Sequence, residues 1–188
     1  KHGVQQNQSQ CFDFIVSLQK ETSLCRNLKA LFVDHPLDCT RGFVSNKKEE
    51  VTILCGITEN CRPVAGVICQ PFKLKSKKIC EFNPRVYVGS EYFTNEVEKK
   101  FCYEYSHKKN SWKKHEEFDS AQHSKTERKV AISSRRIPPK QHYLMNNVSM
   151  ERAEMGGAGN KFVALIKKEV GTLMFINART SKWDSCAG

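Results

Sequence analysis

The chain changes character at Val33-Asp34-His35-Pro36-Leu37-Asp38-Cys39-Thr40, where the apolar run Ala30-Leu31-Phe32 is followed by an acidic loop. An apolar run that ends in this way is typical of a buried strand that presents oxygen ligands at its C-terminal edge. Pro36 fixes one backbone torsion angle, so we expect Asp38 and Thr40 to leave the strand in a defined direction. Carboxylates, a backbone carbonyl and a hydroxyl suit Mg²⁺, which prefers compact oxygen ligands. The alternative interpretation is that Asp38 and Thr40 form only a local turn.

The flanking sequence predicts strands and helices in alternation. Two runs rich in β-branched residues predict a hairpin, and Gln70-Pro71 should end its second strand. Apolar residues at helical spacing predict the helices. The predicted elements are a helix over Phe12–Leu31, hairpin strands over Val51–Thr58 and Val64–Cys69, further strands over Lys129–Ser133 and Thr172–Ile176, and helices over Lys140–Asn147, over Asn160–Glu169 and from Trp183-Asp184 onward.

Residues 73–128 depart from this pattern. They carry the lysine-rich runs Lys73–Lys78 and Lys108–Lys114, few aliphatic residues and scattered aromatic ones. Within them Arg85–Gly89 fits a short strand and Glu91–Tyr105 a partial helix. We therefore expect a divergent, partly disordered basic excursion inside a single domain that spans residues 1–188.

Composition places the chain among globular proteins. Its 188 residues suffice for one domain with a core, and no apolar run approaches the roughly 20 residues of a membrane span. Nine cysteines occur without any Cys-x-x-Cys pair, which argues against zinc ribbons. Because Cys55 and Cys69 lie inside apolar runs, we expect a reducing, cytoplasmic compartment. Since the chain begins with Lys1 rather than Met, we expect a piece of a longer protein.

The formal net charge of +11 favours anionic partners. A phosphorylated small molecule fits this charge, and a nucleic acid bound by Lys73–Lys78 and Lys108–Lys114 is an alternative. The two basic runs lack a recognisable nucleic-acid-binding fold, so we favour the small molecule. The sequence contains no feature that indicates an oligomeric state.

Five motifs, taken in order, resemble a known family. The stretch from His35 to Phe43 resembles the signature Asp-Pro-Leu-Asp-Gly-Thr-Lys-Glu-Phe/Tyr of the inositol monophosphatase superfamily, which comprises Mg²⁺-dependent, lithium-sensitive phosphomonoesterases. Glu50–Ile57 and Arg62–Phe72 look like the two strands that follow that signature. Gly156–Lys161 and Trp183–Gly188 are similar to the branch called 3'(2'),5'-bisphosphate nucleotidases.

The resemblance implies roles for residues at matching positions. Asp38 and Asp184 would be metal ligands, Leu37 would offer its carbonyl oxygen, and Thr40 would orient the attacking water. Without the resemblance, Asp184 reads as a helix N-cap. In the same way, Gly157, Lys161 and Ser134 would contact the nucleotide, with backbone N–H groups near Gly157 facing a phosphate at a helix start.

The sequence also departs from the family pattern at the signature. His35 stands where the family has an aspartate that bridges two metal ions, and neutral imidazole is a poor Mg²⁺ ligand. Asp34 is a further candidate ligand, although strand alternation points it to the opposite face. Cys39 replaces a glycine and adds a Cβ atom.

The resemblance implies an α/β fold, a layered α+β sandwich of the sugar-phosphatase type that is incomplete at both ends. It implies a Mg²⁺-dependent phosphatase that removes the 3'-phosphate of adenosine 3',5'-bisphosphate or of its sulfated form. One alternative is a catalytically inactive relative that binds the nucleotide. The second alternative is a basic nucleic-acid-binding protein.

Overall fold

A computed structural model describes residues 30–60, 62–76, 79–93, 98–115, 128–133, 150–175 and 181–188. In it six strands form an antiparallel sheet in which every strand pairs with the next one along the chain. The strands are β1 (Ala30–Asp38), β2 (Thr52–Glu59), β3 (Arg62–Ser76), β4 (Ile79–Phe93), β5 (Glu98–Ser106) and β6 (Ser111–His115). Between β1 and β2 lie the short helix α2 (Thr40–Val44) and the 3₁₀ helix η2 (Lys48–Glu50).

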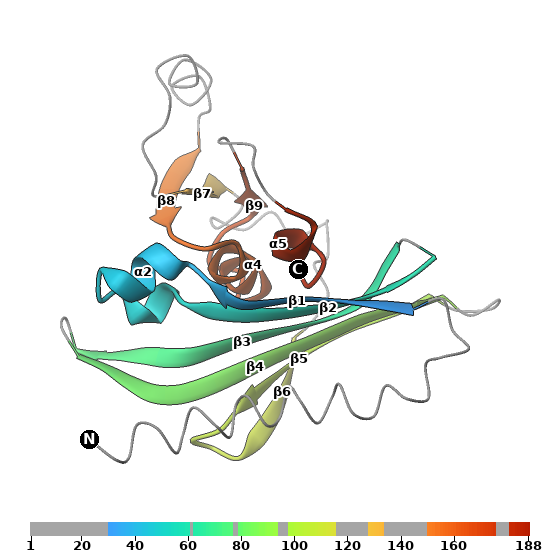
Figure 1. Cartoon of the computed structure of the whole chain (residues 1–188), viewed down its shortest axis with the longest axis horizontal. Coiled ribbons are helices and arrows are strands. Elements are labelled where there is room, and N and C mark those ends of the chain that lie inside the picture. The colour runs from blue at the N-terminus through green and yellow to red at the C-terminus, as the bar shows by residue number, and fades with distance from the viewer. Residues whose placement is uncertain are drawn as a thin grey trace.

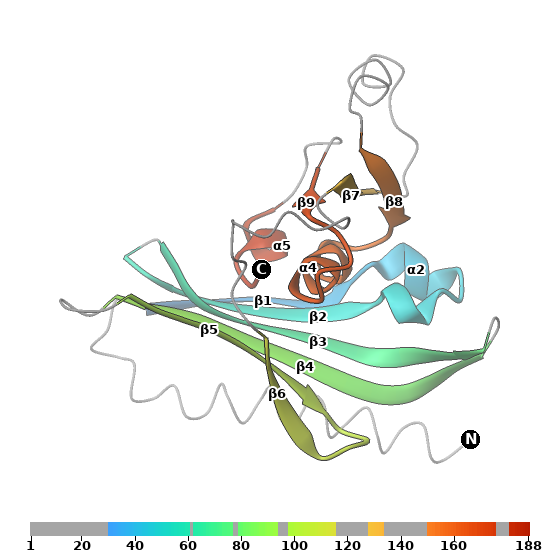
Figure 2. The same cartoon turned by 180° about the vertical axis from the view of Figure 1, so that it is seen from behind.

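A second, parallel sheet lies on the other side of a helical layer (Figures 1 and 2). Its strands are β7 (Lys129–Ser133), β8 (Glu151–Met155) and β9 (Thr172–Leu173), in the order β8-β7-β9. The helices α4 (Ala158–Ile166) and α5 (Lys182–Ser185) cover one face of the large sheet, and the small sheet lies beyond α4. The predicted layered α/β sandwich is confirmed.

Helix α4 lies between the two sheets and buries apolar side chains on two of its faces. Val163 belongs to a buried cluster with Leu54 of β2, Ile68 of β3 and Tyr87 of β4. Ala164, the next residue, belongs to a second cluster that includes Ala131 of β7. Burial of apolar side chains on both faces therefore couples the two sheets through one helix.

The predicted hairpin is confirmed, but its second strand is longer than expected. Strand β3 continues through Gln70-Pro71 to Ser76, and its register with β4 shifts between Gln70 and Phe72. Gln70 and Phe72 lie opposite Arg85 and Phe82, so the extra residue is on β4, opposite Pro71, which lacks the N–H group that a regular ladder needs. Pro71 therefore interrupts the pairing without ending the strand.

Of the two elements predicted in the middle of the chain, one is confirmed and one is wrong. The strand at Arg85–Gly89 is confirmed as part of β4, whereas no described residue of Glu91–Tyr105 is helical. Tyr103 and Tyr105 of β5 instead pair with Val88 and Val86 of β4. Aromatic and β-branched residues in register across two strands stabilise a sheet, and this pairing overrides the local helical pattern. The described parts of residues 79–115 thus extend the large sheet.

The remaining predictions agree in kind and differ in extent. The strand at Lys129–Ser133 is confirmed, α4 begins and ends earlier than Asn160–Glu169, and α5 is a single turn. Ala30 and Leu31, expected at the end of a helix, begin β1. β9 covers only Thr172 and Leu173. Three of the predicted parts lie outside the described residues. They are residues 12–29 of the first predicted helix, the predicted helix Lys140–Asn147, and Ile176 at the end of the last predicted strand. Within the described part of the chain, every helix is too short or too polar to cross a membrane.

The buried cluster that joins Leu54 of β2 to Val163 of α4 leads to a stability prediction. Leu54→Ala should lower the free energy of unfolding by about 3 kcal/mol, because it leaves a cavity in a cluster where Leu54 has no exposed surface. Leu74→Ala is the matched control, because Leu74 is 44% exposed, and it should cost less than about 1 kcal/mol. Urea denaturation followed by circular dichroism measures both. Equal losses would contradict this description of the core.

Candidate metal centre

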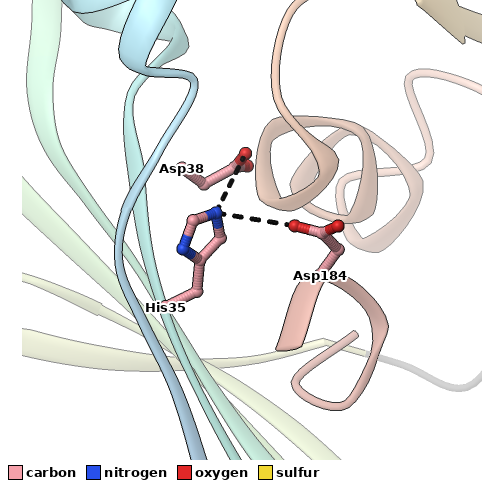
Figure 3. Close-up of side chains that lie close together, drawn as sticks. All are labelled: His35, Asp38 and Asp184. Carbon is pink, nitrogen blue, oxygen red and sulfur yellow. Dashed lines mark ion pairs between the residues drawn. The ribbon is translucent and has the colours of Figure 1, made fainter. Parts of the chain in front are cut away.

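His35, Asp38 and Asp184 come together at the end of β1. One ligand atom from each of them lies within 4.8 Å of the other two. His35 and Asp38 come from β1, while Asp184 comes from α5, near the other end of the chain. Figure 3 shows one imidazole nitrogen of His35 facing both carboxylates. The structure thus brings together two of the motifs that the sequence singled out.

An irregularity in β1 places His35 and Asp38 on the same face. His35 is opposite Leu54 and Asp38 is opposite Thr52, so β1 uses one residue more than β2 over this interval. Residues three apart in a regular strand point to opposite faces, and one extra residue reverses that alternation. Pro36 lies inside the irregularity, on a strand that forms the edge of the described sheet, where proline is tolerated.

Asp38 is buried and held by three hydrogen bonds. Its Oδ2 accepts hydrogen bonds from the Thr52 hydroxyl at 3.0 Å and from the Gly159 backbone N–H at 2.8 Å, and its Oδ1 accepts one from the Cys39 N–H at 2.8 Å. Asp38 is 7% exposed, and Thr52 has no exposed surface. Gly159 lies in the first turn of α4, where the helix dipole favours a negative charge. Asp38 thus connects β1, β2 and α4.

Asp184 is fixed by its own helix. Ser181 and Asp184 form a capping box at the start of α5, in which Asp184 Oδ2 accepts a hydrogen bond from the Ser181 N–H at 2.7 Å. The other oxygen, Oδ1, faces His35. The N-cap interpretation and the ligand interpretation are therefore compatible, because each uses a different oxygen of the carboxylate.

The His35 imidazole contacts both carboxylates through one nitrogen. Nε2 lies 3.5 Å from Asp184 Oδ1 and 3.9 Å from Asp38 Oδ1. Asp34, the neighbouring residue, is exposed and lies outside this trio. The expectation that alternation turns Asp34 away thus agrees with the structure.

The loop after β1 forms a tight turn that contains two further candidates. The Thr40 hydroxyl is exposed and donates a hydrogen bond to the Leu37 carbonyl at 3.4 Å, as in a local turn. Cys39 has φ of 63°, in the left-handed region that glycine adopts most readily. Burial raises the pKa of the Cys39 thiol, and the Glu50 and Asp38 carboxylates raise it further against a backbone hydrogen bond from Gly42.

The glycine loop before α4 packs directly on Asp38. Gly157 has φ of 75°, and a Cβ atom there would lie 2.8 Å from Asp38 Oδ2. Lys161 is 3% exposed, and its Nζ donates a hydrogen bond to the Gly157 carbonyl at 3.0 Å. The N–H of Gly159, which belongs to the loop whose N–H groups were predicted to face a phosphate, donates a hydrogen bond to Asp38 Oδ2. Ser134 lies outside the described residues.

Sequence reasoning missed the residues that hold Asp38. Thr52 is the first residue of β2 and Gly159 is the third glycine of the cluster, so each was read only as part of an element. A buried threonine facing a predicted acidic loop is a weak signal, and only the register of β1 with β2 makes it specific.

A comparison with family models identifies the family of this chain. The inositol monophosphatase family matches residues 25–188, and the chain therefore belongs to that family. No curated protein matches the chain.

The similar solved structures share the fold at low identity. CysQ from Bacteroides thetaiotaomicron, a bacterial member of the inositol monophosphatase family, is 18% identical with a TM-score of 0.56, and the match covers 88% of this chain and 59% of that one. SuhB of Mycobacterium tuberculosis is 14% identical with a TM-score of 0.62 over 94% of this chain and 68% of that one. An IMPase/NADP phosphatase complexed with Mg²⁺ and phosphate is 14% identical with a TM-score of 0.57 over 97% of this chain and 63% of that one.

Members of the family are metal-dependent phosphatases that use Mg²⁺. The donors of the trio fit this ion only in part. Asp38 and Asp184 offer the hard oxygens that Mg²⁺ prefers, and both are oriented by backbone donors. His35 offers a nitrogen, which suits Mg²⁺ poorly.

The buried contact between Thr52 and Asp38 leads to a second prediction. Thr52→Val keeps the shape and removes one donor from a buried carboxylate, so it should lower the free energy of unfolding by about 2 kcal/mol. Thr172→Val makes the same change at an exposed position and should stay within about 0.5 kcal/mol of the unchanged protein. Chemical denaturation compares the two variants. A loss no larger at Thr52 than at Thr172 would contradict the hydrogen bond.

Proposed function

We propose that this chain carries the cation-binding part of a phosphomonoesterase site that removes the 3'-phosphate of adenosine 3',5'-bisphosphate or of its sulfated form. The observation that carries the proposal is the convergence of Asp38 and Asp184, from two separate motifs, beside the start of α4. The packing of α4 against both sheets supports treating residues 1–188 as one phosphatase-like domain.

Asp38 and Asp184 would hold the divalent cation, and the Leu37 carbonyl would be a further ligand. A cation bound there neutralises phosphate charge and lowers the pKa of a bound water. Mg²⁺ is the ion that the family resemblance proposes for this role. The residues of the chain supply the geometry: the capping box fixes Asp184, and three donors fix Asp38.

Thr40 would position the attacking water. Its hydroxyl donates to the Leu37 carbonyl, so the oxygen lone pairs remain available to accept a hydrogen bond from a water. Thr40 is exposed, as a group that meets solvent and substrate must be. The turn that the structure shows is thus compatible with the catalytic role.

The nucleotide would bind near the glycine loop. Gly157 and Lys161 match the family positions that contact the nucleotide, and Ser134 is the third proposed contact. Because Lys161 Nζ donates to the Gly157 carbonyl, we propose that Lys161 acts by holding the loop in place. A net charge of +11 favours a polyanionic small molecule, and nucleic acid remains the less favoured partner. We propose a cytoplasmic location from the use of cysteine.

One observation favours a second candidate, an inactive relative that binds nucleotide without turnover. His35 lies between the two carboxylates, at a position where the family signature has an aspartate. Loss of one negative ligand weakens the hold on closely spaced cations, because their mutual repulsion is then less compensated.

The proposal predicts slow, metal-dependent release of inorganic phosphate from adenosine 3',5'-bisphosphate. Asp38→Asn should lower this rate at least tenfold, since ligand orientation alone is worth about 10–100-fold. Asp34→Asn makes the same change one strand residue before His35, at an exposed position, and should leave the rate unchanged. A phosphate assay with and without lithium measures all three proteins, and the proposal expects lithium to inhibit. Turnover unaffected by Asp38→Asn would refute the site.

The second candidate leads to a separate prediction. His35→Asp should raise the phosphatase rate with Mg²⁺ by about tenfold, because it restores an oxygen ligand beside Asp38 and Asp184. His107→Asp is the matched control, since His107 is exposed in the turn between β5 and β6. If His35→Asp leaves both the rate and the Mg²⁺ affinity unchanged, the histidine is not what limits the site.

A further inference from the structure

We infer that the centre formed by His35, Asp38 and Asp184 binds a transition-metal dication such as Co²⁺ or Zn²⁺ in preference to Mg²⁺. The inference rests on the cation site of the proposed function and concerns which ion that site selects. It is carried by the position of the imidazole, whose Nε2 is directed at both carboxylates (Figure 3).

Ligand chemistry is the first step of the argument. Imidazole nitrogen is a ligand for Zn²⁺, Cu²⁺, Ni²⁺ and iron, whereas Mg²⁺ takes almost only oxygen. A set of one nitrogen and two carboxylates also suits Zn²⁺, which accepts His with Asp or Glu and leaves a position open for water. Replacing an oxygen ligand by the His35 nitrogen therefore moves the preference of the centre away from Mg²⁺.

The geometry of the trio is the second step. Ligands about 2.1 Å from a tetrahedral ion lie roughly 3.4 Å from one another. The distance from His35 Nε2 to Asp184 Oδ1, 3.5 Å, already has this value, and the distance to Asp38 Oδ1 is 3.9 Å. All three ligand atoms lie within 4.8 Å of one another, so the widest separation exceeds the tetrahedral value by at most about 1.4 Å.

The surroundings of the carboxylates are the third step. Asp184 uses Oδ2 for the Ser181 N–H and directs Oδ1 at His35. Asp38 uses Oδ2 for Thr52 and Gly159, and its Oδ1 both accepts the Cys39 N–H and faces His35. Outer contacts of this kind orient metal ligands. The two carboxylates are thus aimed at one point. Asp184 is held through its other oxygen, whereas Asp38 Oδ1 offers the cation the lone pair that the Cys39 N–H does not use.

The competing explanation is that a protonated His35 is itself the counter-ion of the two carboxylates. In that case Nε2 bears a proton that it shares between the two carboxylates, and the centre binds no transition metal more tightly than Mg²⁺. The two explanations differ in a measurable quantity, the ratio of the affinities for Co²⁺ and Mg²⁺.

Titration of the full chain with the metals alone tests the inference. Co²⁺ and Mg²⁺ are added separately in calorimetry, and Co²⁺ also in visible absorption, to the unchanged protein, His35→Asp and His107→Asp. We expect tighter binding of Co²⁺ than of Mg²⁺ by the unchanged protein. In His35→Asp the Co²⁺ affinity should fall at least tenfold and the Mg²⁺ affinity should rise about tenfold, since outer contacts alone change metal affinity by about 10–100-fold.

The control separates the centre from other ligands. Free cysteines elsewhere in the chain bind Co²⁺, but His35→Asp leaves them unchanged, so only the difference between the two spectra reports the centre. His107→Asp should behave like the unchanged protein. Asp184→Asn, which removes a ligand from α5 instead of β1, should also lose Co²⁺ affinity without gaining Mg²⁺ affinity. Thermal unfolding by circular dichroism shows that each variant is folded.

The outcomes are distinct from those of the proposed function. Equal Co²⁺ affinity in the unchanged protein and both ligand variants overturns the inference, and so does tighter binding of Mg²⁺ by the unchanged protein. Release of phosphate with Mg²⁺ alongside either result would leave the proposed function standing. Conversely, tight His35-dependent Co²⁺ binding without phosphate release under any ion would support the inference and refute the phosphatase.

Discussion

The arrangement of this protein depends on the buried carboxylate of Asp38. Its hydrogen bonds reach the Thr52 hydroxyl on β2 and the Gly159 N–H on α4, so one side chain connects three elements that are far apart in sequence. A buried carboxylate without such donors would cost several kcal/mol, and this cost selects the conformations in which all the donors are present. The registry of β1 against β2 and the position of α4 are therefore linked through Asp38.

The glycines around α4 follow from the same constraint. Helix α4 can donate to Asp38 only if its first turn approaches β1 and β2 closely. A Cβ atom at Gly159 would contact Thr52 Oγ1, and one at Gly157 would contact Asp38. The glycine cluster that the sequence predicted to be a phosphate loop is thus required for packing. Because packing alone requires these glycines, the motif does not by itself indicate a phosphate.

The sequence predicted the parts of this arrangement that local chemistry determines. The hairpin of β2 and β3 and the strand at Lys129–Ser133 follow from β-branched runs. The grouping of Asp38 with Asp184 came from the family resemblance of their two motifs. The sequence misled where pairing between strands decides the outcome. The lysines and spaced tyrosines of β5 look like a partial helix until Val86 and Val88 of β4 lie opposite them. The bulges at Pro71 and after His35 depend likewise on the partner strand, which no local pattern shows.

The same dependence on Asp38 bears on how the centre meets a cation. Three donors of the protein already satisfy Asp38, and the capping box satisfies one oxygen of Asp184, so neither carboxylate relies on a cation for its orientation. Little reorganisation would then accompany binding of the proposed cation, and its affinity would be governed by the chemistry of His35, the proposed third ligand. At that position the chain has a histidine in a strand irregularity that also contains a proline. In the proposed centre, a single residue type in β1 would therefore set the chemistry, while the rest of the fold maintains the geometry.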